Sequence, residues 1–112
     1  MSTTSSACLF YGYVRPYDEE QGEYEETSWD KNFLNESHGC TIHVYGFDER
    51  LGSFLSVNDS YKEAKWDDAV LLLPDSLFVK EGWNEQLQNA AHFFDLDITG
   101  LNAQWHLVCL YF

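Results

Sequence analysis

Basic side chains and long apolar runs are what this sequence lacks most. Lysine and arginine together number 6 against 19 aspartates and glutamates, so the formal net charge is −13. A strongly anionic protein repels other polyanions, which argues against nucleic acid and anionic membranes as direct partners. No apolar run reaches the roughly 18 residues of a membrane-spanning helix, and residues 1–7 lack the positive flank and apolar stretch of a secretory signal. We therefore expect a soluble, cytoplasmic protein.

The three cysteines and the seven glycines are scattered along the sequence. Cys8, Cys40 and Cys109 are odd in number, far apart and each set in an apolar, strand-like stretch. We expect buried, reduced thiols, with one disulfide and a spare thiol as the alternative. The scattered glycines form no phosphate-binding loop at a helix start, and no Gly-x-Ser-x-Gly motif or known Cys-His signature is present. These patterns predict no cofactor and no enzymatic activity.

The length and the apolar content of the chain indicate a single hydrophobic core. A chain of 112 residues that is 45% apolar and 17% aromatic is large enough for a single domain but not for two. We expect one α+β domain over residues 1–112. Residues 17–26 contain no basic side chain and predict a solvated acidic loop. Residues 58–81 form an irregular segment whose strand candidate is the apolar run 69–73.

Apolar periodicity predicts six elements in the order strand, helix, strand, strand, helix, strand. They fall at residues 7–14, 28–37, 40–46, 53–57, 83–94 and 104–112, and the two middle strands form a hairpin. This order resembles the split βαβ, or ferredoxin-like, arrangement (βαββαβ). The resemblance is one of element order, and it implies a four- to five-stranded antiparallel sheet with two helices packed on one face.

Alternation along each strand divides the predicted sheet into two faces. The more aliphatic set is assigned to the core under the helices, joined by Trp29, Phe33, Leu87 and Phe94. The other face is then aromatic, comprising Tyr11, Tyr13, His43, Tyr45, Phe54, Trp105 and Tyr111. Exposed tyrosine and tryptophan are typical anchors of a recognition surface. Cover by residues 58–81 or by a second copy of the chain is the alternative interpretation.

Possible metal ligands lie close in sequence in two places. His38, Cys40 and His43 form one group, and His106 with Cys109 forms the other. Cys40 and His43, like His106 and Cys109, are three positions apart, and such residues face opposite sides of a strand, so neither pair can readily close around one ion. We expect no metal site.

Negative charge is concentrated as well as abundant. Residues 17–36 contain eight acidic side chains and one lysine. Six of the acids fall in the predicted loop, at Asp18, Glu19, Glu20, Glu23, Glu25 and Glu26. Such a surface can simply keep a small protein soluble. It can also steer association with a basic partner.

Together, the aromatic face and the acidic loop suggest a non-enzymatic binding protein that neutralises a basic, nucleic-acid-handling enzyme. In size, charge and aromatic content the chain is similar to bacterial immunity proteins that block nuclease toxins and to phage anti-defence inhibitors that mimic DNA. Two alternatives stay open. One is a small enzyme or ligand-binding domain with a His/Tyr site on the sheet face. The other is a homodimer that pairs through its aromatic faces.

Overall fold

The computed structural model describes residues 5–15, 28–47, 50–65 and 77–111. The expected acidic loop 17–26 and the strand candidate 69–73 lie outside these residues. The described elements are β1 (Ser5–Arg15), α1 (Ser28–Lys31), β2 (Glu36–Ser37), β3 (Cys40–Phe47), β4 (Arg50–Val57), the 3-10 turn η2 (Asn58–Ser60), β5 (Lys62–Lys65), α2 (Trp83–Phe93) and β6 (Gln104–Tyr111).

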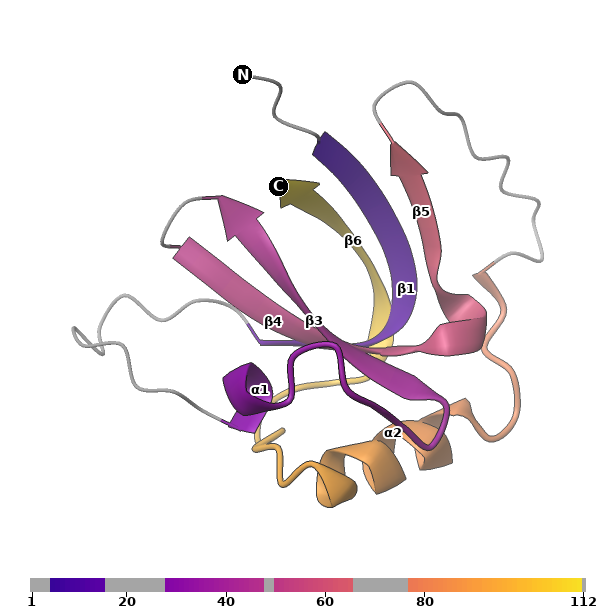
Figure 1. Cartoon of the computed structure of the whole chain (residues 1–112). Coiled ribbons are helices and arrows are strands. Elements are labelled where there is room, and N and C mark those ends of the chain that lie inside the picture. Colours follow the sequence, from indigo (N-terminus) through magenta and orange to yellow (C-terminus); the bar gives the residue numbers. More distant parts are fainter. Residues whose placement is uncertain (1–4, 16–27, 48–49, 66–76, 112) are drawn as a thin grey trace.

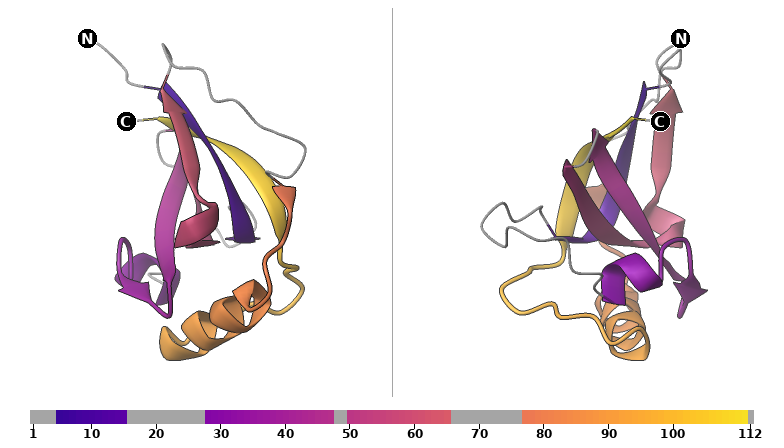
Figure 2. Two further views of the ribbon diagram at one scale, coloured as in Figure 1. Left: turned by 90° about the vertical axis from the view of Figure 1, so that its right-hand side faces the viewer. Right: turned by 60° about the vertical axis from the view of Figure 1, so that its left-hand side comes forward.

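The strands form one curled sheet in the order β2-β3-β4-β1-β5. β6 pairs antiparallel with β1 from Ser5 to Gly12 and also meets β3, where Gly46 lies parallel to Leu110. Because β6 touches strands on both sides of β4, the sheet bends into a half-barrel, and Figure 1 shows β6 lying beside β1 and turning toward β3. In both views of Figure 2, α2 lies across the end of the sheet away from the chain termini.

The expected ferredoxin-like arrangement with two helices on one face is wrong. The predicted helix 28–37 is a single turn, α1, followed by the short strand β2. The helix stops because Leu34 takes a positive φ of 63° and its amide donates to the carbonyl of Ile42 on β3 (2.8 Å) instead of continuing the helix. The amide and the side chain of Asn32 both donate to the Ser28 carbonyl, which closes the single turn. The chain therefore joins the sheet here and leaves α2 as the one longer helix among the described residues.

Four strands, the hairpin and the second helix agree with the elements predicted from the sequence. β1, β3, β4 and β6 overlap the expected strands, and β3 pairs antiparallel with β4 from Cys40 to Phe47. α2 matches the stripe beginning at Trp83, and it ends where Asp95 takes a φ of 55° and the Leu96 amide donates to the Ala91 carbonyl. β5, within the segment expected to be irregular, pairs with β1 from Ser6 to Leu9 and was not predicted.

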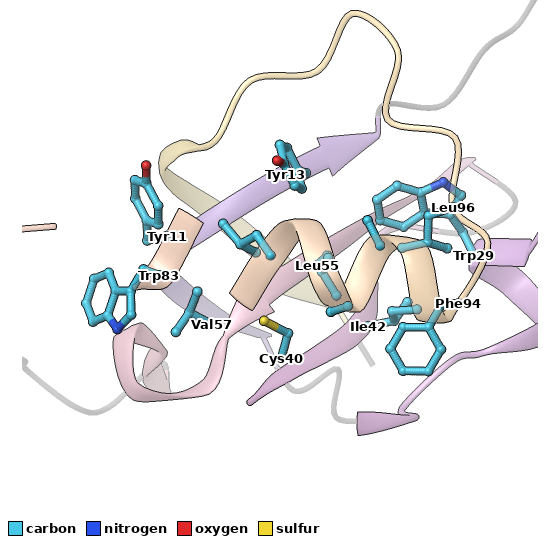
Figure 3. Packing of buried hydrophobic residues seen from close by; sticks show 13 residues of the cluster. Tyr11, Tyr13, Trp29, Cys40, Ile42, Leu55, Val57, Trp83, Phe94 and Leu96 are labelled. Atoms are coloured by element: carbon cyan, nitrogen blue, oxygen red, sulfur yellow. The ribbon is translucent and has the colours of Figure 1, made fainter. Parts of the chain in front are cut away.

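The main core lies between α2 and one face of the sheet. Figure 3 shows its buried side chains, with Trp83 at one end and Trp29 and Phe94 at the other. The helix contributes Leu87, Ala90 and Ala91, and the sheet contributes Ile42, Leu55 and Val57. Trp29, Leu87 and Phe94 are buried as expected, whereas Phe33 is 44% exposed and does not join this core.

Cys8 and Cys40 are buried thiols, as their apolar neighbours predicted. Burial raises the pKa of the Cys40 thiol to about 12, with a smaller contribution from Glu36. The thiol therefore stays protonated at neutral pH and packs as an apolar group. The side chain of Cys109 lies outside the described part of the structure.

Candidate functional site

The expected exposed aromatic face does not exist for the residues whose side chains the structure describes. Tyr11 and Tyr13 are only 6% exposed and belong to the core under α2, where the Tyr11 hydroxyl donates to Asn84 Oδ1 (2.7 Å). Phe54 is fully buried on the opposite face of the sheet. Trp105 and His43 are half-buried. These side chains are divided between two faces and cannot form one docking surface.

Strand register explains this error. Residues directly opposite each other in neighbouring strands lie on the same face of a sheet. Tyr13 lies opposite Leu55, and Leu55 lies opposite Ile42, so the tyrosines of β1 share the α2 face with the aliphatic residues of the hairpin. Cys8 and Phe10 alternate with these tyrosines along β1, and they belong to the second buried cluster, with Phe54.

The second face carries five aromatic rings in contact, here called the inner stack. In order of contact they are Tyr61, His43, Phe54, Phe10 and His106, with ring-centroid distances of 5.0, 4.8, 4.1 and 5.6 Å. Two of these contacts are direct cross-strand pairs, His43 with Phe54 and Phe10 with His106. No described helix covers this face. Phe10 and Phe54 are fully buried and pack with Cys8 against the half-buried Val14, Tyr61 and Val108.

Both histidines of the inner stack favour the neutral state. Burial lowers the pKa of His43 below its ordinary value, and the carboxylate of Glu63 opposes part of this effect. Burial also lowers the pKa of His106, against a smaller opposing effect from a hydrogen bond with the Gly12 backbone. Neither ring lines the cavity at the start of α2 that is described below. The inner stack packs the second face of the sheet, and a His/Tyr site on the sheet stays a prediction.

The lowered pKa of His43 predicts a pH dependence of stability. As the pH falls through about 6.5, the ordinary pKa of histidine, the unfolded chain takes up a proton before the folded chain does. The contribution of His43 to folding is therefore present above that pH and is lost as the pH falls toward the lower pKa of the folded state. In His43→Phe, which keeps a ring at this position, this loss should be absent.

The measurement is urea unfolding of the parent and of His43→Phe between pH 8 and pH 5. The free energy of unfolding of the variant, relative to the parent, should increase as the pH falls. His106→Phe should show a change of the same sign, because burial lowers the pKa of His106 in the same direction. A difference between variant and parent that is constant across the range would contradict the prediction.

The remaining predicted site residues have no described side chains. Tyr45 lies opposite Gly52 in the hairpin, and Tyr111 lies opposite Ser5. The six acidic residues Asp18, Glu19, Glu20, Glu23, Glu25 and Glu26 lie outside the described residues altogether. Their contribution to a partner-binding surface stays a prediction.

A different exposed surface lies beside the C-terminal end of α2. Its apolar side chains are Phe33 (44% exposed), Leu34 (60%) and Phe93 (64%), here called the apolar edge. The turn that carries Phe33 and Leu34 packs against this end of the helix: Asn32 Nδ2 lies 3.5 Å from the Phe94 carbonyl oxygen, and the ring of His38 meets that of Phe93 edge-on at 5.8 Å.

The backbone around the apolar edge is strained. Leu34, His38 and Asp95 are the described non-glycine residues with positive φ, at 63°, 55° and 55°. A leucine in the left-handed region costs about 1–2 kcal/mol, and its exposed side chain contributes little burial in return. Strain of this kind is concentrated at functional sites. The strained residues therefore favour a functional role for the apolar edge.

The charges next to the apolar edge are mainly negative. Glu36 and Asp95 are both exposed on the segments that form it. Asp97 follows, and its pKa is lowered by hydrogen bonding to Thr99, with a smaller effect of Arg15. The acidic segment 17–26 precedes α1 directly in the sequence. Apolar side chains with a charged rim are typical of protein-binding surfaces.

Helical periodicity in the sequence indicates one residue of the apolar edge, Phe93. Phe93 and Phe94 are adjacent in the predicted helix 83–94, so the two rings cannot share one helix face. Once Phe94 was assigned to the core, Phe93 had to point elsewhere. Nothing in the sequence indicated that Phe33 and Leu34 would lie near it, because that proximity depends on how the turn after α1 folds back.

Within residues 5–15, 28–47, 50–65 and 77–111, no three His, Cys, Asp or Glu side chains lie close enough together to hold a metal ion. The same part of the chain has no helix long and apolar enough to cross a membrane. Comparison with protein families, with curated proteins and with solved structures gives no match to this chain.

Proposed function

We propose that this protein is a non-enzymatic acidic module that binds a basic protein and masks the partner's nucleic-acid site. The observation that carries the proposal is the apolar edge next to acidic side chains, in a chain of net charge −13. Phe93 and Leu34 would act as anchors, and the carboxylates of segment 17–26 would accelerate the encounter with a cationic surface. A protein that handles nucleic acid provides such a surface.

The test begins with the tagged full chain, recovered from its native cells at low salt and at 0.5 M salt, with mass spectrometry of the bound proteins. For a basic protein released by salt, association and dissociation rates are then measured by surface plasmon resonance. The triple variant Glu19→Gln/Glu20→Gln/Glu23→Gln should slow association about tenfold, because steering depends on charge. Excess protein should also inhibit the partner's binding to a DNA or RNA oligonucleotide.

Separate variants address the apolar edge. Phe93→Ala and Leu34→Gly should each weaken affinity about tenfold or more, mainly through faster dissociation. Leu34→Gly also relieves the positive φ, so its fold should be retained. Leu107→Ala is the matched control, because Leu107 is 71% exposed but lies on β6. Salt-independent binding, or equal losses in the control, would contradict the proposal, as would a dimer of the chain alone that buries Phe93.

A further inference from the structure

A cavity of about 500 Å³ lies where the start of α2 meets β6, η2 and β5. Six of the side chains that line it carry the argument: Asp59, Lys62, Phe78, Lys80, Trp83 and Trp105. Its volume falls within the range of small-molecule sites, about 300–1,000 Å³. The cavity and the apolar edge lie at opposite ends of α2, because Trp83 is the first residue of the helix and Phe93 is the last.

The apolar wall of the cavity is aromatic and fixed in place. The rings of Trp83 and Trp105 meet edge-on at 5.9 Å, and each lies 5.8 Å from the ring of Tyr11. Tyr11 is held by its hydrogen bond to Asn84, in the first turn of α2. A wall of rigid aromatic side chains favours a flat apolar or aromatic ligand, since stacking and edge contacts form without loss of side-chain freedom.

The charge of the cavity is opposite to that of the chain. Lys62 and Lys80 are two of the six basic residues of the whole protein, and Asp59 is the acidic residue in the lining. Within the described residues, neither lysine forms an ion pair. The N-cap of α2, Gly82, makes no side-chain capping bond, so the positive end of the helix dipole next to Trp83 is not capped. Glu81 and Glu85 are close in sequence but do not line the cavity.

We propose that this cavity binds a small organic anion with a flat aromatic body. The carboxylate or similar group of the ligand lies between Lys62 and Lys80, and its ring packs against Trp83 and Trp105. The aromatic wall and the two lysines point to the same ligand class independently, one by shape and the other by charge. The proposal does not depend on the protein-binding function, because it uses none of the residues of the apolar edge.

The experiment uses 2-naphthoate as the anionic probe and 2-naphthamide as its neutral counterpart. Each is titrated into the ¹⁵N-labelled full chain while the tryptophan indole N–H signals are followed by NMR. 2-Naphthoate should shift the signals of Trp83 and Trp105 saturably and leave Trp29 unchanged, because Trp29 lies at the other end of the core (Figure 3). 2-Naphthamide should bind at the same place about tenfold more weakly, since it lacks the charge.

Two variants separate the charge from the apolar wall. Lys62→Gln/Lys80→Gln should weaken 2-naphthoate binding about tenfold and leave 2-naphthamide binding unchanged. Lys31→Gln, which removes an exposed lysine from α1, is the matched control and should change neither. Thermal unfolding of each variant establishes that the fold is retained. Equal affinities of the two probes for the parent, an equal loss in the control, or shifts that do not saturate would overturn the proposal.

Discussion

Replacement of Gly12 by alanine is expected to destabilise the protein by about 3 kcal/mol or more. Gly12 lies in the middle of β1, opposite Ser56 on β4 and Gln104 on β6. A Cβ atom at this position would overlap the carbonyl oxygen of Leu55 and lie 2.9 Å from its carbonyl carbon. These are backbone atoms, so relief requires β1 and β4 to move apart. Folded domains are stable by only about 5–15 kcal/mol, so this loss is a large fraction of the total.

Urea unfolding measures the effect as a lower midpoint with an unchanged slope. Ser56→Ala is the matched control, because Ser56 lies directly opposite and its buried hydroxyl has no hydrogen-bond partner among the described residues. Removal of an unpaired buried hydroxyl should leave stability unchanged or raise it by about 1 kcal/mol. Equal midpoints for Gly12→Ala and the parent would show that β1 and β4 are farther apart than the structure places them.

Truncation of Phe10 to alanine is expected to cost about 3–5 kcal/mol. Phe10 has no exposed surface and lies between Phe54 and His106 in the inner stack, with its ring 4.1 Å from that of Phe54 and tilted by 14°. Its removal leaves a cavity between β1, β4 and β6 that a curled sheet cannot easily close. Phe10→Leu should retain more than half of the lost stability, because it restores volume but not ring stacking.

The matched control is Phe93→Ala, the same substitution at an exposed position, which should cost about 0.5 kcal/mol or less. Denaturant unfolding of the three variants measures these differences at one pH, chosen above 7 so that His43 and His106 stay neutral. Similar losses for Phe10→Ala and Phe93→Ala would contradict the assignment of Phe10 to a buried stack. The control also shows that Phe93→Ala is suitable for the binding test, because its fold should be intact.

The strands and α2 were predictable because their signals are local. The β-branched and aromatic runs of β3 and β6 favour strands wherever they pair, and the stripe from Trp83 to Phe94 has the helical period. The turn after α1 was not predictable in the same way. Its sequence has helical spacing at Trp29 and Phe33, but the Leu34 amide finds a better acceptor on β3. Tertiary hydrogen bonding overrode a weak local preference.

The proposed binding residues were harder to predict. The tyrosines of β1 suggested an exposed face, yet they are core residues, and the proposed anchors, the exposed Leu34 and Phe93, lie on segments far apart in the sequence. The cavity joins Lys62, Lys80 and Trp105 from three separate segments. No sequence spacing could indicate that these lysines lie near the same tryptophan.

By itself, the sequence determined composition and local structure: a strongly acidic chain with buried thiols, four of its strands, one hairpin and one amphipathic helix. Only the tertiary structure decided which side of each strand faces α2, how far the sheet curls, and which lysines and aromatic rings come together. The physical reason is that alternation gives a strand two faces but does not say which one is covered. Pairing register sets that choice through contacts such as Tyr13 with Leu55, and these join residues far apart in the chain.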